Sequence, residues 1–280
     1  MNKIVTSGKD YLDIDAYSSM VAYAELVGGI AAGNAPLNKS IVDDEDRILR
    51  NYQSTDTDEF IIMDISNPKI FDNMVRENQI GEIIDHHPGF EQYWRERGVK
   101  TQIEKIGAVA TIIWERWRDA GKLDELSRTS GELLMQGILD NTLNFLADIT
   151  SDRDKIAYAD LVERFGDIRE KYFKTVEQKI VTDLRNSLEN DMKVLDFKTL
   201  GREINFYQLA VWDTDEILKR ENEVSEIIDD GMLNLISISK GESQIMTNDE
   251  TIRGWITKLM SEQKLFLRKE VIKRDLEATD

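Results

Sequence analysis

The chain has 280 residues, no cysteine and a formal net charge of −18 at pH 7. This length suggests about two domains, and a hydrophobic share of 41% is enough to build packed cores. The absence of cysteine excludes disulfides and thiolate zinc sites, and it fits a reducing compartment such as the cytoplasm. So acidic a chain should repel nucleic-acid duplexes, and the apolar stretch 20–37 is too polar for a membrane span. We therefore expect a cytoplasmic protein that binds neither duplex nor membrane.

The first half of the chain alternates predicted strands and helices. Short apolar runs predict strands over residues 3–7, 60–65 and 80–84, and helical spacing predicts helices over 16–27, 111–117 and 132–139. Two of the strands are almost wholly apolar and end beside a carboxylate, which is typical of a buried parallel sheet. The fold class is therefore α/β, and residues 1–181 form a domain with a mostly parallel sheet flanked by helices.

The second half has a different pattern. Charged sequence of helical period runs from 151 to about 188. The polar segment 182–191 is the predicted linker, expected as the frayed end of that helix. Alternating runs then predict strands over 203–212, 233–239 and 244–247, separated by helices over 215–229 and 250–260. Residues 192–280 are therefore expected to form a second, smaller α/β domain.

Acidic residues and both histidines of the chain stand at the ends of the predicted elements in the first half. They are Asp13, Asp15, Asp64, Asp85, His86, His87 and Asp140. Because ligands of open parallel sheets sit beyond the carboxyl ends of the strands, we expect the first four carboxylates to lie along one rim. An oxygen-rich set with an imidazole suits Mn²⁺ or Mg²⁺ better than copper or a structural zinc. Each residue alone has an ordinary explanation as a helix cap or a turn residue, and only the combination points to a metal site.

Four segments resemble, in the same order, the motifs of the DHH phosphoesterase superfamily. They are LDIDA, IIMDIS, IIDHHPG and GILDNTLNF. The segment GAVATIIWE is similar to the Gly-Ser-x-Ala-Thr segment of that superfamily, with Ala108 where serine is common. In the second half, GREINFYQ and FLRKEVIKR resemble the second domain of manganese-dependent family II inorganic pyrophosphatases, exopolyphosphatases and prune-type phosphoesterases. A Gly-Gly-Gly-His segment, typical of the nucleotide-cleaving branch, does not occur in the sequence.

The resemblance implies roles for these residues. Two Mn²⁺ or Mg²⁺ ions are held by Asp13, Asp15, Asp64, His86 and Asp140, with Asp64 as the bridge. His87 faces the phosphate, and Asp85 orients the ligands. From the second domain, phosphate oxygens are held by Arg202, Arg268 and Lys269. The active site is then expected between the two domains, where a metal-activated hydroxide attacks phosphorus.

Two positions depart from the pyrophosphatase pattern. Lys9 stands where those enzymes have a histidine ligand, and a protonated lysine cannot bind a metal ion. We expect Lys9 to pair with Asp13 or with a substrate oxygen instead. Glu270 stands where those enzymes have a lysine. Both changes argue against strict pyrophosphate specificity. The missing histidine is shared with the exopolyphosphatase-like and prune-like members, so the resemblance shifts toward them.

The sequence therefore predicts a hydrolase of phosphoanhydride bonds that acts on a small phosphorylated substrate, either pyrophosphate or short polyphosphate. One alternative is a phosphodiesterase acting on small nucleotides. Another is a metal-binding regulatory protein with weak or lost turnover. A homodimer is compatible with either enzyme. The sequence does not rank the substrates.

Overall fold

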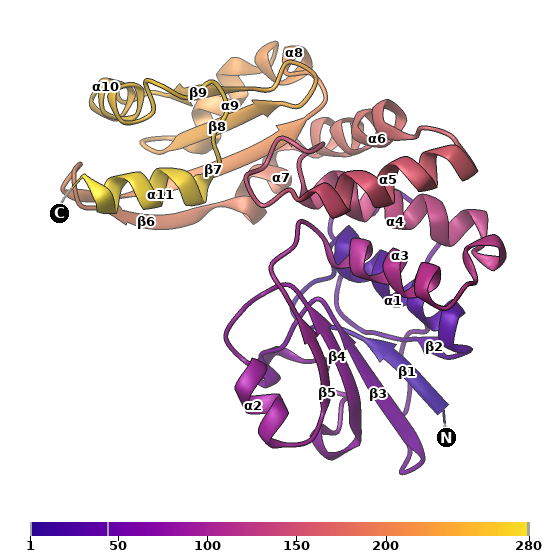
Figure 1. The fold of residues 1–280 in the computed structure, drawn as a ribbon. Helices are drawn as coiled ribbons and strands as arrows, with labels where there is room; N and C mark the ends of the chain where they lie inside the picture. The colour runs from indigo at the N-terminus through magenta and orange to yellow at the C-terminus, as the bar shows by residue number, and fades with distance from the viewer. Residues whose placement is uncertain (1, 44, 279–280) are drawn as a thin grey trace. The chain divides into compact units, whose positions relative to one another are not determined.

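The computed structural model describes residues 2–43 and 45–278 of the chain. These residues form two compact units, Met1–Arg169 and Glu170–Asp280. Figure 1 shows the elements of both units in chain order. No helix of the described residues is both long enough and apolar enough to cross a membrane.

The first unit is built on a five-stranded parallel sheet. Its strands are β1 (Asn2–Thr6), β2 (Ile30–Ala31), β3 (Asp58–Met63), β4 (Ile80–Asp85) and β5 (Lys100–Ile103). They lie in the order β2-β1-β3-β4-β5, and every neighbouring pair is parallel. The carboxyl ends of all five strands therefore meet at one edge of the sheet.

Helices cover both faces of this sheet. On one side lie α1 (Ile14–Val27) and α3 (Val109–Asp119), with α4 (Arg128–Asn141) and α5 (Asp152–Phe165) packed against them (Figure 1). On the other side α2 (Glu91–Glu96) buries Trp94 in a cluster with Phe60, Ile62 and Ile83. Successive strand residues point to opposite faces of the sheet, so the apolar runs of β3 and β4 supply side chains to the hydrophobic layers on both faces.

The second unit contains a mixed four-stranded sheet. Its strands are β6 (Lys193–Phe197), β7 (Arg202–Val211), β8 (Met232–Ser237) and β9 (Glu242–Thr247), in the order β6-β7-β8-β9. Only β7 and β8 run parallel to each other. The helices are α6 (Arg169–Thr182), α7 (Leu184–Asp191), α8 (Asp215–Leu218), α9 (Glu221–Ile228), α10 (Glu250–Leu259) and α11 (Arg268–Glu277).

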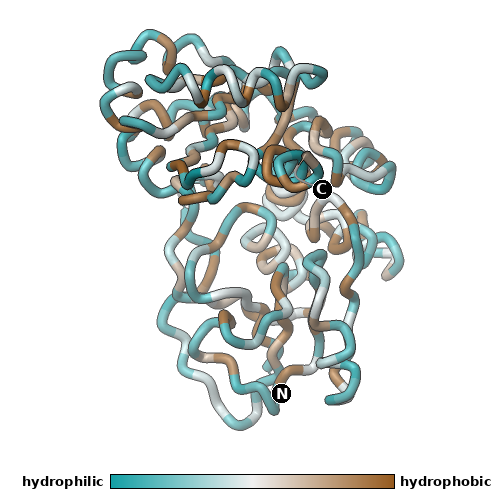
Figure 2. Tube along the Cα trace, turned by 90° about the vertical axis from the view of Figure 1, so that its left-hand side faces the viewer, coloured by the Kyte–Doolittle hydropathy of each residue, from teal (hydrophilic) through white to brown (hydrophobic). Residues whose placement is uncertain are grey.

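The core of the second unit lies between its sheet and two of these helices. Phe197 and Phe206 of the sheet pack with Ile252 and Ile256 of α10 and with Val271 of α11. Hydrophilic residues dominate the outer turns and loops of both units in Figure 2. The opposite face of the sheet is covered as well, since Tyr207, Leu209 and Val211 of β7 are buried there and α7 packs against this strand.

The predicted fold class, α/β with a parallel N-terminal sheet and a smaller second domain, is confirmed. The short edge strands β2 and β5 and the strand β6 carry too little apolar pattern to be predicted. The segment 182–191, expected to be a linker, is largely the helix α7, which buries Leu184 and Leu188. The division between compact units falls at residues 169 and 170, before α6 rather than after it.

The packing of α7 leads to a first prediction. Leu188 is fully buried, so Leu188→Ala should lower the free energy of unfolding by about 2–5 kcal/mol, because it leaves a cavity. Glu189→Ala changes an exposed neighbour on the same helix and should have little effect. Thermal and urea unfolding of the two variants measure this. Equal stability of both variants would mean that 184–191 behaves as an unpacked linker.

Candidate metal centre

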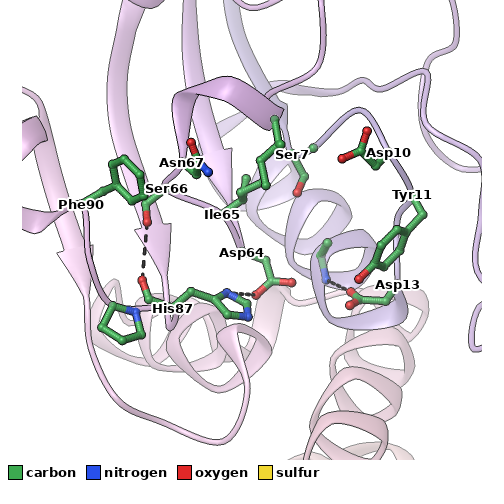
Figure 3. Close-up of a pocket in the computed structure, with 14 residues that line it drawn as sticks. Ser7, Asp10, Tyr11, Asp13, Asp64, Ile65, Ser66, Asn67, His87 and Phe90 are labelled. Atoms are coloured by element: carbon green, nitrogen blue, oxygen red, sulfur yellow. Dashed lines mark hydrogen bonds and ion pairs between the residues drawn. The ribbon is translucent and has the colours of Figure 1, made fainter. Parts of the chain in front are cut away.

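Two carboxylates meet at the edge where the parallel strands end. Asp64 directly follows β3, and Asp85 is the last residue of β4. Asp64 has a φ of 60°, in the left-handed region that residues other than glycine rarely adopt. Such strain persists where the surrounding structure requires it, often at a functional site. Here it turns the chain at the end of β3 and leaves the Asp64 side chain in the pocket shown in Figure 3.

The ring of His86 is held in one protonation pattern. Its Nδ1 lies 3.0 Å from the carbonyl oxygen of Ile106. A carbonyl oxygen can only accept, so Nδ1 carries the hydrogen and Nε2 keeps its lone pair. Burial lowers the pKa of His86, so that the ring stays neutral near pH 7. A metal-binding histidine commonly has this arrangement, with the second ring nitrogen bonded to a carbonyl group.

The lone pair of His86 faces another acceptor. Nε2 of His86 lies 3.4 Å from Oδ1 of Asp64, and both side chains are buried. Oδ1 of Asp64 has no hydrogen-bond partner. Burial raises the pKa of Asp64 well above its usual value, and the nearby carboxylates Asp15, Asp13 and Asp85 raise it further. Two buried lone pairs that face each other need a cation between them, either a proton or a metal ion.

A divalent cation fits this arrangement. Among the described residues, Asp64, His86 and His87 offer ligand atoms that all lie within 4.8 Å of one another. Carboxylate oxygen and imidazole nitrogen together suit Mn²⁺. Its positive charge would also stabilise the cluster of neighbouring carboxylates, Asp13, Asp15, Asp64 and Asp85.

Asp85 is buried and holds the ring of His87. One oxygen of Asp85, Oδ1, accepts hydrogen bonds from Nδ1 of His87 at 2.9 Å and from the backbone N–H groups of His86 and His87. Burial alone raises the pKa of Asp85, but the bonds from His87 and Ser66 hold it below the usual value. In return, the bond to Asp85 raises the pKa of His87. This geometry suits the orienting role that the resemblance gave to Asp85.

Asp15 joins the site to the start of α3. Its carboxylate accepts hydrogen bonds from the backbone N–H groups of Val109 at 2.9 Å and Ala110 at 2.8 Å. Ala108, at the N-cap of α3, has no side chain that could do this. A negative charge at a helix N-terminus is favourable. Burial nevertheless raises the pKa of Asp15 to about 8, with the charge of Asp13 adding to the effect.

Asp13 both caps a helix and lines the pocket beside Asp64. Its Oδ1 caps α1 by accepting a hydrogen bond from the backbone N–H of Ala16 at 3.0 Å. The same residue lines a pocket of about 330 Å³ together with Asp64 and His87. The capping explanation and the metal-site explanation of the LDIDA segment are therefore compatible.

The pocket is acidic and partly apolar. Figure 3 shows Tyr11 and Asp13 on one side of it, with Asp64 and His87 close together. Its lining also includes Ile65 and Phe90. Among the described residues that line it, none is lysine or arginine. Lys9, predicted to contact substrate, is exposed and lies between the lining residues Gly8 and Asp10.

Known proteins resemble the chain along most of its length. No protein-family model matches it. The manganese-dependent inorganic pyrophosphatase of Bacillus subtilis is 23% identical over 242 residues, which span 81% of this chain and 77% of that protein. The chain is a distant homologue of manganese-dependent inorganic pyrophosphatases.

Solved structures show a fold similar to that of this chain. A Methanococcus jannaschii protein described as a putative family II inorganic pyrophosphatase superposes with a TM-score of 0.62 at 20% identity, covering 99% of this chain and 98% of its own. An exopolyphosphatase-related protein from Bacteroides fragilis gives a TM-score of 0.57 at 14% identity, covering 99% and 92%. The similarity therefore extends over both units of this pyrophosphatase homologue.

The last turn of α4 brings Asn141 into the site. Nδ2 of Asn141 donates to Oδ2 of Asp15 at 2.7 Å and lies 3.5 Å from Nε2 of His86. Asp140, the predicted ligand, precedes Asn141 in the same helix, and successive helical side chains point about 100° apart. The role of Asp140 stays a prediction.

The basic residues predicted to hold phosphate lie in the second unit. Arg268, at the start of α11, pairs with Asp191 and bonds its carbonyl oxygen at 2.9 Å. Arg202 pairs with Asp249 at the other end of β7, about 20 Å along the strand from Gln208, which contacts Arg268. Lys269 is exposed. Arg202 and Arg268 thus already have acidic partners.

Sequence reasoning missed several residues of the site. Asn141 lies inside the motif GILDNTLNF, next to the predicted ligand, while Tyr11 and Phe90 are directly adjacent to the motifs LDIDA and IIDHHPG. An asparagine beside an aspartate offers similar ligand atoms, so the sequence gives little reason to prefer it. Aromatic residues in loops have no regular spacing along the sequence from which a position in a pocket could be predicted.

The raised pKa values lead to a prediction for the metal-free protein. Asp15, Asp64 and His87 all bind protons more tightly in the folded state than in the unfolded state. Stability should therefore fall as pH rises from about 6.5 to 8, because each extra proton held by the folded state changes stability by about 1.4 kcal/mol per pH unit. Melting temperatures in chelator at several pH values measure this.

Two changes should remove this dependence. Asp64→Asn eliminates one of the repelling carboxylates, and saturating Mn²⁺ favours the deprotonated ligands. Asp64→Asn and saturating Mn²⁺ should each flatten or reverse the fall in melting temperature between pH 6.5 and 8. A melting temperature of the metal-free wild type that is constant or rises from pH 6.5 to 8 would contradict the assignment of a strained acid cluster.

The pairing of Arg268 leads to another prediction. Arg268→Ala leaves Asp191 without its cation and should cost about 1.5–3 kcal/mol of unfolding free energy, toward the lower end because Asp191 remains partly exposed. Lys269→Ala should leave stability unchanged. Urea unfolding of both variants makes the comparison. Equal stability would mean that Arg268 contributes no structural contact and is available only for binding.

Proposed function

We propose that this chain is a manganese-dependent hydrolase that cleaves the phosphoanhydride bonds of pyrophosphate or short polyphosphate. The observation that carries the proposal is the buried pair of acceptors formed by Asp64 and His86, which requires a cation. The names of the homologues support Mn²⁺ as that cation and pyrophosphate as the type of substrate. The order of the four DHH-like motifs in the sequence supports the same family.

Bound Mn²⁺ would supply Lewis acidity and lower the pKa of a coordinated water molecule. In this role Asp64 and His86 hold the ion, with Asp13, Asp15 and Asp140 as further proposed ligands. The hydrogen bond from Nδ1 of His86 to Ile106 keeps Nε2 directed at the site. The rigid strand ends of β3 and β4 hold the first ligands in place, as a metal site requires.

His87 is the proposed contact to the phosphate. Its side chain is 63% exposed and lines the pocket. Because Nδ1 of His87 bonds to Asp85, Nε2 is the ring nitrogen left for a ligand in the pocket. The raised pKa of His87 favours the charged ring. An imidazolium ion can donate a strong hydrogen bond to a phosphate oxygen or to a leaving group.

The pocket itself provides few other positive charges. No lysine or arginine occurs among its described lining residues. A multiply charged phosphate would therefore depend on metal ions and His87 for charge neutralisation within the first unit. Contacts from Lys9, Arg202, Arg268 and Lys269 remain part of the proposal on the basis of the sequence resemblance.

A second candidate function is a small-nucleotide phosphodiesterase. Tyr11, Ile65 and Phe90 line the pocket, and Tyr11 is 61% exposed. Pyrophosphate has no apolar part that would contact such side chains, whereas an aromatic ring can stack on a base. The third possibility, a binding protein without turnover, gives no reason for Asp85 to orient His87.

The assay that tests these candidates measures phosphate release from pyrophosphate, tripolyphosphate, long polyphosphate and small nucleotides, with Mn²⁺ or Mg²⁺. We expect the phosphoanhydrides to be cleaved with Mn²⁺. Asp64→Asn should reduce turnover by more than about 100-fold, since even outer-shell changes cost 10–100-fold. Asp56→Asn is a matched control near the opposite end of β3.

Each result has a defined meaning. Activity confined to nucleotides would select the phosphodiesterase. Near-normal pyrophosphate turnover by Asp64→Asn would rule out Asp64 as a metal ligand. No release from any substrate, together with normal Mn²⁺ binding, would favour the regulatory protein.

A further inference from the structure

Asn141 stands where two side chains of the metal centre converge. Its Nδ2 donates to Oδ2 of Asp15 at 2.7 Å and lies 3.5 Å from Nε2 of His86. The lone pair of this His86 nitrogen also faces Oδ1 of Asp64 at 3.4 Å. The Asn141 amide thus contacts the centre from α4, whereas Asp64 and His86 reach it from the sheet.

The end of α4 is built around this position. Leu143, Asn144 and Phe145 are three consecutive residues with left-handed φ angles of 47°, 55° and 67°. None is glycine, so the turn carries a conformational cost. The hydroxyl of Thr142 stabilises the turn by donating to the carbonyl of Ile138 and accepting from the N–H of Phe145. The strained turn ends the helix directly after Asn141, at the level of the site.

We propose that Asn141 is a ligand of the metal centre and contributes its neutral amide oxygen when Mn²⁺ is bound. This inference rests on the proposed function for the presence of the metal ion. Amide oxygens are good ligands for hard divalent cations. Rotation of the amide about its last side-chain bond exchanges Nδ2 for Oδ1. It also frees one lone pair of Oδ2 of Asp15 for the same ion, while this oxygen keeps its hydrogen bond from the N–H of Val109.

The proposal explains the contact with His86. In the metal-free centre, the N–H of Asn141 satisfies part of the negative charge of Asp15. When a cation arrives, a donor at this place becomes repulsive and an acceptor becomes favourable. The amide can provide either, whereas a carboxylate would only add to the repulsion among Asp13, Asp15 and Asp64.

One consequence concerns affinity. A neutral ligand attracts a divalent cation less strongly than a carboxylate in the same place, since the number of charged ligands tunes affinity. The centre should therefore bind Mn²⁺ more weakly with Asn141 than with an aspartate there. A weakly bound ion also exchanges more easily, so the occupancy of the metal centre would depend on the concentration of free Mn²⁺.

The test is a calorimetric titration of Mn²⁺ into the chelator-stripped full chain, supported by the rise in melting temperature with Mn²⁺. Asn141→Asp should bind Mn²⁺ about tenfold more tightly or better. Asn141→Ala should bind about tenfold more weakly or worse. Asn78→Asp adds the same charge to an exposed turn at the opposite end of β4 and should bind as the wild type does.

Asp140→Asn completes the experiment, because Asp140 is the competing candidate on the same helix turn. Wild-type affinity in both Asn141 variants, or a loss in Asp140→Asn without a loss in Asn141→Ala, would overturn the role of Asn141. Failure of the wild type to bind Mn²⁺ at all would instead overturn the proposed function. Circular dichroism of each metal-free variant confirms folding, and Asn141→Asp remains informative if Asn141→Ala does not fold.

Discussion

The structure of the first unit depends on two buried acceptors that face each other. Oδ1 of Asp64 and Nε2 of His86 lie 3.4 Å apart at the edge where parallel strands end. Oδ1 of Asp64 has no hydrogen-bond partner, and the only donor near Nε2 among the described residues is the amide of Asn141 at 3.5 Å. Desolvation makes such an arrangement unfavourable unless a cation is present. The surrounding contacts hold this pair in place, and the folded state therefore carries a cost that a proton or a metal ion between the two atoms would remove.

These surrounding contacts come from distant parts of the sequence. Ile106 fixes the hydrogen on His86, Asp85 orients His87, and Asp15 connects the centre to the N-terminus of α3. Each contact satisfies a backbone or ring group that would otherwise be unpaired in the interior. The same bonds that hold the ligands therefore also stabilise the sheet-to-helix junctions, so stability and metal affinity are linked.

The distribution of charge follows from this arrangement. The pocket in the first unit is lined by acids and apolar groups, with His87 as its basic side chain among the described residues. In the second unit, Arg268 is already paired with Asp191 and Arg202 with Asp249. Cations that are paired within a unit must exchange partners before they bind another anion. In a chain with a formal net charge of −18, a bound metal ion would therefore add positive potential that the described lining residues other than His87 do not supply.

The sequence by itself determined the fold class, the parallel direction of the main strands and the position of Asp64 and Asp85 at their carboxyl ends, since apolar runs that end in aspartate have few other interpretations. It did not determine the order of the strands in the sheet. It could not determine how the side chains are paired. The helix α7 in the expected linker, the capping of α3 by Asp15 and the partner of Arg268 all depend on contacts between residues far apart in the chain. The choice between Asp140 and Asn141 shows the same limit. Neighbouring residues with similar oxygen atoms are alike in sequence, and only the folded helix shows that the amide of Asn141 lies 3.5 Å from Nε2 of His86.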